Sequence, residues 1–222
     1  MATRTKPKPK AKRKDRTELL AQAEKSRTRG RRKRAITLYR ELLKQDPGDL
    51  TVHGRVAPLL AAEGLHDEAM ASFRTAASGH AAAGFADRGI AVLRQAAELF
   101  PEDEPLWTEL VSLHLQRGRR GDAVAVLLDG GERLLSGRFR PIGAKLLRRA
   151  LELEPWNVKG TLLLARTLSK ERRGGEAVAL LEGLARRVGG KAQRQALGLA
   201  FRTSPSPARL WRWLAGRRGA TE

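Results

Sequence analysis

The residues that could carry out catalysis or bind a metal are few in this chain. Histidine occurs four times, at His53, His66, His80 and His114. No two of them are one helical turn apart with an acid between them, which is the spacing that binds zinc on a helix. His53 and His114 fall where helix-packing aromatic residues are expected, so we interpret them as core or boundary residues. The chain has no cysteine, which excludes thiolate metal sites and disulfides. We predict no metal or other cofactor.

Two further motifs resemble parts of enzymes but lack essential residues. The segment VGGKAQ, residues 188–193, resembles a phosphate-binding loop. It lacks the leading glycine at the required distance and has Ala192 where a hydroxyl is needed, so we interpret it as a turn that ends a helix. Serines such as Ser72 and Ser136 have no histidine and acid in a recognisable hydrolase setting. We therefore predict that the protein is not an enzyme.

Positive charge lies at the two ends of the chain, whose net charge is +20. Residues 1–34 hold 15 Lys and Arg against 3 Asp and Glu, residues 186–222 hold 9 against 1, and residues 35–185 hold 20 of each. Such clusters can bind phosphates, with an affinity that falls as salt rises. The alternative is that they only keep the protein soluble. The candidates for contact with a polyanion, either nucleic acid or an anionic membrane, are Lys10, Lys12, Arg13, Lys14, Arg31, Arg32, Lys33, Arg34, Arg212, Arg217 and Arg218.

The two basic ends differ in sequence. MATRTKPKPKAKRKDR, residues 1–16, is low-complexity sequence without a large apolar anchor, which predicts a disordered tail. EKSRTRGRRKRA, residues 24–35, is predicted to form a basic helix end and turn. SPSPARLWRWLAGRRG, residues 204–219, interleaves Trp211 and Trp213 with arginines. We interpret it as a helix that caps the last repeat; the alternative is a helix that docks on a membrane or a partner. The sequence leaves open which tryptophan is buried.

The elements that carry these residues are predicted to be helices. Hydrophobic residues make up 41% of the chain and aromatic residues 5%. Alanine, leucine and arginine dominate and favour helices, whereas the residues that favour strands are sparse. Apolar runs such as VAPLLAA are too short to span a bilayer, and no apolar segment follows the basic N-terminus as it would in a secretory signal. We expect a soluble, cytoplasmic, all-α protein.

A repeat runs through the chain at a constant interval. Pro47, Pro101 and Pro155 lie 54 residues apart. The same interval separates Arg40, Arg94 and Arg148; Glu68, Asp122 and Glu176; Ala69, Ala123 and Ala177; Gly64 and Gly118; and Phe85 and Phe139. The next proline, Pro205, comes four residues early, and we place the deletion near RRVGGK, where the third unit's middle helix is expected to end early. Several positions that share one interval indicate an internal repeat.

Each repeat unit is predicted to contain three helices. LTVHGRVAPLLAAEG ends at Gly64, HDEAMASFRTAASGHAAAG ends near Gly84, and FADRGIAVLRQAAELFP ends before Pro101. The proline separates repeat units. The residue six positions later, His53, Trp107 or Thr161, is predicted to pack in the next helix. The small residues Ala69, Gly89, Ala123, Gly143 and Ala177 are predicted to let neighbouring helices approach closely.

These residues resemble the tetratricopeptide-repeat (TPR) family. Trp107, Leu110, Gly118, Ala123 and Leu127 follow the order and spacing of that family's motif, whose second half is matched by Ala35, Tyr39 and Pro47. Val111 and Ala57 stand where the family prefers glycine. The resemblance implies a right-handed α-solenoid of TPR-like helical repeats, with about twelve helices. We assign residues 17–205 to this repeat domain, 206–217 to the C-terminal capping helix and 218–222 to a short tail.

The resemblance also implies a function, because TPR proteins bind peptides or helices of other proteins in a groove. We expect a non-catalytic scaffold or adaptor whose partner is a protein or peptide of unknown identity. The groove candidates are polar residues on the first helix of each unit, namely Arg55, Glu109, Gln116, Lys159 and Arg166. The alternative is a protein that binds nucleic acid or an anionic membrane surface through its basic ends.

Overall fold

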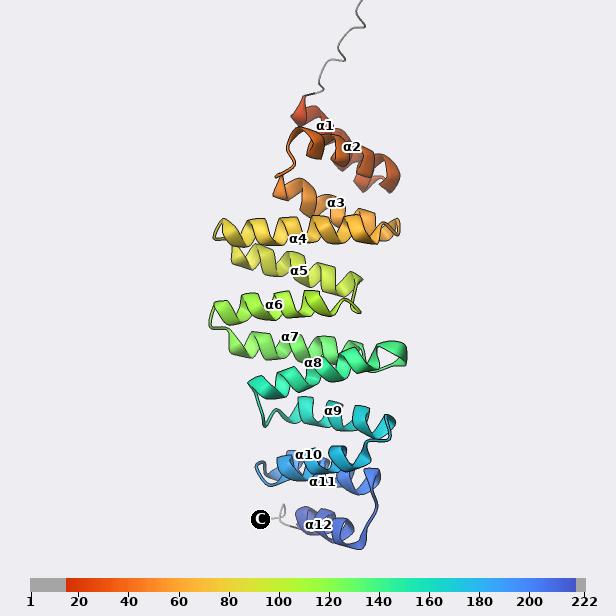
Figure 1. Ribbon diagram of the computed structural model, residues 1–222, viewed down its shortest axis with the longest axis vertical. Helices are drawn as coiled ribbons and strands as arrows, with labels where there is room; N and C mark the ends of the chain where they lie inside the picture. Colours follow the sequence, from red (N-terminus) through yellow and green to blue (C-terminus); the bar gives the residue numbers. More distant parts are fainter. Residues whose placement is uncertain (1–14, 219–222) are drawn as a thin grey trace, which may run out of the picture. The chain divides into compact units, whose positions relative to one another are not determined.

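The computed structural model describes residues 15–218, and side chains up to residue 216. Within that range it contains twelve α-helices, one short 3₁₀ turn and no strand (Figure 1), as the composition predicts. The α-helices are α1 (Arg16–Thr28), α2 (Arg32–Gln45), α3 (Leu50–Ala62), α4 (His66–Ala82), α5 (Ala86–Leu99), α6 (Glu104–Gln116), α7 (Arg120–Arg133), α8 (Arg140–Leu153), α9 (Val158–Lys170), α10 (Gly174–Ala185), α11 (Gly190–Thr203) and α12 (Pro207–Arg218).

The chain divides into two compact units, with the boundary inside α5 between Val92 and Leu93. In the first unit, α1 packs on α2, α2 on α3 and α3 on α4. In the second, the helices from α6 to α12 each pack on the next one along the chain. Buried leucines, alanines and aromatic residues fill the spaces between these pairs. Packing between sequence neighbours is the arrangement expected of a helical repeat.

One capping position recurs with the repeat. Asp49, Asp103 and Asn157 are the N-caps of α3, α6 and α9. Each side chain accepts a hydrogen bond from the backbone amide three residues later, at 3.1, 3.2 and 2.9 Å respectively. An N-cap of this kind satisfies an amide that the helix leaves unpaired, and replacing it with alanine costs about 1 kcal/mol. The first helix of every unit therefore begins in the same way.

The repeated prolines lie between helices, as predicted, with Pro47 between α2 and α3, Pro101 between α5 and α6, and Pro155 between α8 and α9. Pro58 is different, because it lies inside α3. Proline in a helix interior removes a backbone hydrogen bond and crowds the carbonyl four residues earlier. That earlier residue is Gly54, and α3 continues through the proline to Ala62.

The turn after the first helix of each unit needs a left-handed backbone conformation. Gly64 and Gly118 adopt it, with φ of +77° and +68°. Arg172 is the equivalent residue of the third unit and has φ of +61°. It is the sole non-glycine residue with positive φ in the described part of the chain. A side chain makes this conformation unfavourable. The third unit therefore keeps the same turn, but the backbone of Arg172 is strained there.

The middle helix of the third unit is short, as the spacing of the prolines predicts. The middle helices α4, α7 and α10 have 17, 14 and 12 residues. After α10, Arg186 and Arg187 form a turn, Val188 and Gly189 lead into α11, and Gly190, the first residue of α11, has φ of +58°. The helix-ending turn thus lies just before VGGKAQ, whose residues from Gly190 onward begin α11.

The small residues of the repeat allow close helix packing, as predicted. Ala69, Ala123 and Ala177 are fully buried. A Cβ atom on Gly89 would lie 2.8 Å from a backbone oxygen of α4, and one on Gly143 would lie 2.9 Å from a backbone oxygen of α7. These two glycines are required because the neighbouring helix occupies the position of a side chain.

Candidate functional site

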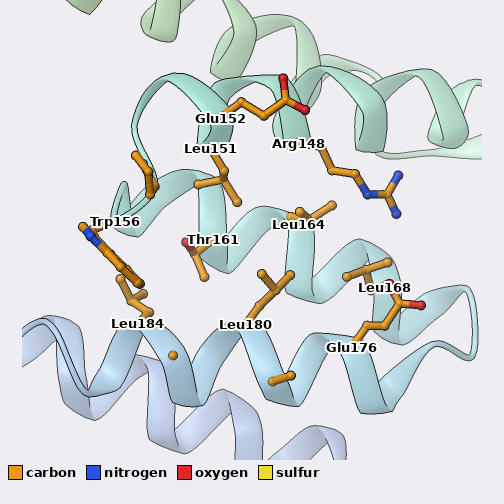
Figure 2. Close-up of a pocket in the computed structure, with 13 residues that line it drawn as sticks. Arg148, Leu151, Glu152, Trp156, Thr161, Leu164, Leu168, Glu176, Leu180 and Leu184 are labelled. Atoms are coloured by element: carbon orange, nitrogen blue, oxygen red, sulfur yellow. The ribbon is translucent and has the colours of Figure 1, made fainter.

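A groove of about 650 Å³ lies between α8, α9 and α10 in the second unit. Leu151, Leu164 and Leu180 line its middle (Figure 2). Trp156, whose side chain is 49% exposed, lies at one end. The side chains of Arg148 and Glu176 lie at the other end (Figure 2). The groove therefore offers an apolar centre, an aromatic end and a charged end.

A smaller cavity of about 310 Å³ is the repeat equivalent of this groove. Its lining comes from α5, α6 and α7, all from residue 94 onward. Eight of its nine lining residues lie 54 positions before a residue that lines the groove. The two sites are thus the same position in successive repeat units, and their difference in volume must come from individual side chains.

The main difference lies six residues after the repeat proline. In the smaller cavity this residue is Trp107, which is buried and whose Nε1 donates a hydrogen bond to the carbonyl oxygen of Pro101 at 2.8 Å. In the groove it is Thr161. The indole packs against Gly130, whereas the groove has Leu184 at the equivalent position, so these two positions exchange bulk between the units. The groove also has Gly183 where the smaller cavity has Asp129, which removes a side chain from its lining.

Arg148 is a charged lining residue without a partner. In the first unit the equivalent arginine, Arg40, pairs with Glu68 through a hydrogen bond of 2.8 Å. In the groove the corresponding carboxylate, Glu176, is held instead by Arg173 through contacts of 2.7 and 2.6 Å. The Nη2 atom of Arg148 is buried and has no hydrogen-bond partner among the described residues. A buried donor left unpaired costs about 1–3 kcal/mol.

The aromatic end of the groove carries a second cation. The guanidinium of Arg187 lies over the ring of Trp156, 4.9 Å from its centroid. This cation–π contact orients the indole while leaving half of its surface exposed. An exposed, oriented indole beside an apolar groove is a suitable surface for contact with another protein.

The predicted groove residues lie elsewhere. Arg55 of α3 makes an ion pair of 2.9 Å with Glu24. Glu109 and Gln116 are on α6, half-buried and exposed respectively. Lys159 and Arg166 are on α9, where Lys159 pairs with Glu132 at 2.6 Å and Arg166 lines another cavity, with Lys170 and Arg202. None of the five lines the groove between α8 and α10, and a binding role for them stays a prediction.

Sequence reasoning did not identify Arg148 or Trp156 as site residues. One signal was present in the repeat, since the position six residues after the proline changes from Trp107 to Thr161. A second signal was the change from Asp129 to Gly183, which removes a side chain at the equivalent lining position of the third unit. The unpaired state of Arg148 had no such signal, because it depends on Arg173 binding Glu176.

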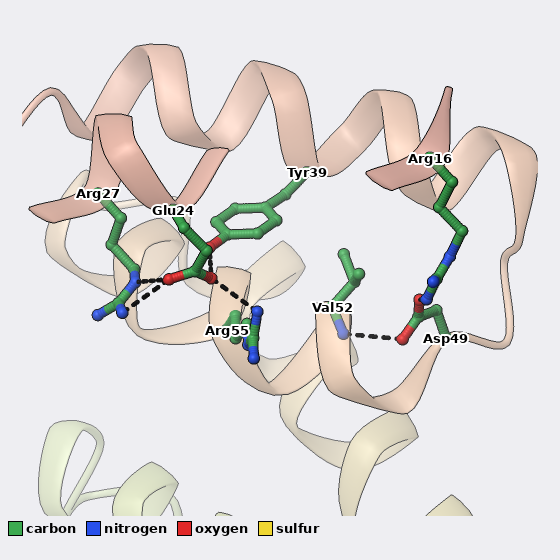
Figure 3. Close-up of polar contacts among 7 residues, drawn as sticks. All are labelled: Arg16, Glu24, Arg27, Tyr39, Asp49, Val52 and Arg55. Carbon is green, nitrogen blue, oxygen red and sulfur yellow. Dashed lines mark hydrogen bonds and ion pairs between the residues drawn. The ribbon is translucent and has the colours of Figure 1, made fainter. Parts of the chain in front are cut away.

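The ion pair of Arg55 belongs to a polar cluster in the first unit (Figure 3). Glu24 accepts hydrogen bonds from the side chains of Tyr39, Arg27 and Arg55. Burial tends to raise the pKa of Glu24, but the hydrogen bonds from Tyr39 and Arg27 outweigh it and hold the pKa below its ordinary value. Burial, with a contribution from Glu24, raises the pKa of Tyr39 to about 12. The ion pair of Arg55 with Glu24 therefore helps to hold α3 against α1.

The basic turn between α1 and α2 is exposed. Arg31, Arg32, Lys33 and Arg34 are all exposed, and no ion pair joins any of them to a carboxylate among residues 15–216. The candidates Lys10, Lys12, Arg13 and Lys14, together with the predicted tail at residues 218–222 and the side chains of Arg217 and Arg218, lie outside what the structure describes.

Helix α12 packs against α11 through one of its two tryptophans. The ring of Trp213 stacks on Phe201, with centroids 6.1 Å apart and planes at 7°. Trp211 is 68% exposed. Arg212, a polyanion candidate, pairs with Glu182 of α10 at 3.2 Å. Trp213 is thus the tryptophan that packs, a point that the sequence left open.

Two of the four histidines, His53 and His114, pack against other groups within the repeat. His114 is buried in α6, and burial lowers its pKa, with Asp122 acting in the opposite direction. His53 Nε2 lies 3.0 Å from the carbonyl oxygen of Pro47, the same contact that Trp107 makes with Pro101. Among residues 15–216, no three His, Asp or Glu side chains form a group that could hold a metal.

None of the helices described here has the length and apolar character needed to cross a bilayer.

Solved structures similar to this chain are TPR proteins. Yeast Tom70 has a TM-score of 0.41 and 16% identity over 85% of this chain, which spans 40% of Tom70. YrrB, described as a TPR protein with an unusual peptide-binding site, has a TM-score of 0.32 and 11% identity over 92% of each chain. TTC0263 of Thermus thermophilus has a TM-score of 0.28 and 17% identity, over 92% of this chain and 100% of its own. Likenesses this low support no inference about function.

A family model gives a more specific result than the solved structures. No curated protein matches the chain. The model named bacterial transcriptional activator domain matches residues 10–137, more than half of the chain, and it describes a helical repeat domain related to the TPR proteins. The interval, the helix pairs and this match agree, and the chain belongs to the bacterial transcriptional activator domain family.

Proposed function

We propose that this protein is a non-catalytic interaction scaffold that binds a segment of a partner protein in the groove between α8, α9 and α10. The observation that carries the proposal is the open, mainly apolar groove of about 650 Å³ at a position where the preceding repeat unit has a cavity of about 310 Å³. Such a volume, lined by leucines and with an exposed tryptophan at its end, is typical of sites that bury side chains of a ligand. The family is named for transcriptional activators, and a scaffold role is compatible with that setting.

The experiment fills the groove from one of its own lining positions. Gly183→Trp adds an indole where a Cβ atom meets no atom closer than 4.0 Å, while Gly183→Ala leaves the groove open. Proteins captured from native extract by the wild type and by Gly183→Ala, but not by Gly183→Trp, would support the proposal. Equal capture by all three forms would contradict it. Circular dichroism on each variant establishes that the helices are intact.

A second candidate function is polyanion binding through the turn between α1 and α2. The observation in its favour is the group of exposed cations without carboxylate partners, Arg31, Arg32, Lys33 and Arg34. Fluorescence anisotropy with short duplex DNA, single-stranded RNA and acidic vesicles over a salt series tests it. A steep loss of affinity with salt that disappears when the four residues are changed to glutamine would support this function. Binding that is insensitive to both salt and the substitutions would contradict it.

A further inference from the structure

We infer that the partner segment in the groove between α8, α9 and α10 is apolar and carries an aspartate or glutamate, whose carboxylate pairs with Arg148. This inference rests on the proposed function and specifies the chemistry of the partner. Apolar side chains of the segment contact Leu151 and Leu180, and an end of the segment packs against Trp156. Two observations support this inference, namely the apolar lining of the groove and the unpartnered Nη2 of Arg148.

The repeat shows what Arg148 lacks. Its equivalent in the first unit, Arg40, is neutralised within the chain by Glu68. The carboxylate that could do the same for Arg148 is Glu176, but both oxygens of Glu176 bind the guanidinium of Arg173. Because Arg173 precedes Glu176 by three residues at the start of α10, this local pair forms without any contribution from α8.

The charge of Arg148 is placed where a bound segment can meet it. Its Nη2 is buried and unpartnered, and its side chain extends from α8 toward the charged end of the groove (Figure 2). A half-buried guanidinium favours a carboxylate acceptor, because charge-assisted hydrogen bonds are the strong ones and a guanidinium can donate two in parallel. Glu152 also lines the groove one helical turn after Arg148, but no ion pair joins the two. The guanidinium is therefore complementary to an acidic side chain of a bound segment.

The rest of the lining requires the segment to be apolar. Leu151 and Leu180 are half-buried and present hydrocarbon to the groove, above the buried Leu164, Leu168 and Leu184. An acidic peptide without apolar residues would leave this surface unfilled. Trp156 stands half exposed at the far end, where it can cover an apolar side chain. A protein segment that spans from Trp156 to Arg148 uses both ends and the apolar middle.

The test is selection from a library of random twelve-residue peptides displayed on phage, with full-length protein as the target. We expect peptides selected by the wild type to contain leucine, isoleucine or phenylalanine together with an aspartate or glutamate. For a selected peptide made synthetically, Arg148→Met should weaken binding by about 10- to 100-fold, since it keeps much of the apolar stem and removes the charge. Arg148→Glu should shift the selection toward lysine and arginine.

The matched control is Arg94→Met, which changes the equivalent arginine one unit earlier and should leave the affinity within about twofold. Thermal unfolding of each variant shows whether the fold is retained. Selected peptides that lack acids, or an acidic preference that survives Arg148→Met and Arg148→Glu, would overturn the inference while leaving the scaffold function intact. Failure to select any peptide that Gly183→Trp releases would instead count against the proposed function. Competition by a medium-chain fatty acid in the absence of peptide binding would also overturn the inference.

Discussion

At the residue scale, substitutions within the repeat decide where this chain differs from a regular solenoid. Trp107 lines the smaller cavity and donates a hydrogen bond to Pro101, and Gly183 leaves the groove without the side chain that Asp129 supplies one unit earlier. Gly64 and Gly118 make the same turn that Arg172 makes with an unfavourable backbone conformation. Each departure acts locally, because the residues around it keep the conformation that the repeat imposes.

The strained turn leads to a prediction about stability. Arg172→Gly should raise the free energy of unfolding by about 1 kcal/mol, because a glycine adopts φ of +61° without a side-chain conflict. The measurement is urea unfolding followed by circular dichroism. Arg172→Ala is the control, since it keeps the Cβ atom, and it should change the free energy by less than about 0.5 kcal/mol. A loss of stability in the glycine variant would show that the arginine side chain contributes more than the strain costs.

At the element scale, α1 is attached to its neighbours by three polar contacts. Glu24 of α1 meets Tyr39 of α2 and Arg55 of α3, and Arg16 pairs with Asp49, the N-cap of α3 (Figure 3). Burial opposes ionisation of Asp49, but the hydrogen bond from Arg16 and that from the Val52 amide hold its pKa below its ordinary value. Both acids therefore stabilise the folded chain in their ionised forms.

These lowered pKa values predict acid sensitivity. Glu24 and Asp49 bind protons more weakly in the folded chain than in the unfolded one, so their contribution is fully present above their ordinary pKa values of 4.5 and 3.8. It is lost as the pH falls through the folded values. The free energy of unfolding, measured by urea from about pH 6 to about pH 3, should fall less steeply in Glu24→Gln than in the wild type. Equal slopes would contradict this assignment.

The last helix allows a comparison of two tryptophans in one element. Trp213→Ala should destabilise the packing of α12 on α11 by about 2 kcal/mol, because it removes the ring stacked on Phe201. Trp211→Ala should have an effect below about 0.5 kcal/mol, because that ring is largely exposed. Limited proteolysis near residue 205 gives the local opening rate for each variant. A larger effect from Trp211→Ala than from Trp213→Ala would contradict the assignment of Trp213 as the residue that packs α12 on α11.

At the scale of the whole molecule, the two compact units hold different candidate binding sites. The first unit holds the exposed basic turn and the cluster around Glu24. The groove lies entirely within the second, between α8 and α10. In a helical repeat each unit packs only on the units next to it. The function proposed for the groove should therefore require only the helices around the groove.

A fragment of residues 86–222 should therefore stay helical and bind a groove-selected peptide with an affinity within about threefold of the full chain, as measured by fluorescence anisotropy. The control fragment, residues 86–153, ends with α8 and lacks α9 and α10, so it should not bind. Loss of binding by a folded 86–222 fragment would show that the first unit contributes to the site.

Much of this fold follows from the order of residues along the chain. The interval of 54 residues, the prolines between units, Gly64 and Gly118 at helix ends and the early end of α10 are all visible in the sequence. They are predictable because helix caps, breakers and apolar stripes act over a few neighbouring residues and recur at the same interval in each unit.

The partner surface and the pairing of charges required the three-dimensional arrangement. Polar residues predicted to face a groove from helical phase, such as Arg55 and Lys159, are paired with Glu24 and Glu132 from other helices. Conversely, Arg148 loses its repeat partner to Arg173. The first two ion pairs join side chains that are distant in sequence and adjacent in space, and the third is a local pair that occupies the carboxylate a distant arginine could have used. Helical periodicity indicates the face of the helix on which a residue lies. The ion pair that the residue makes depends on which oppositely charged side chain lies within reach in the folded chain.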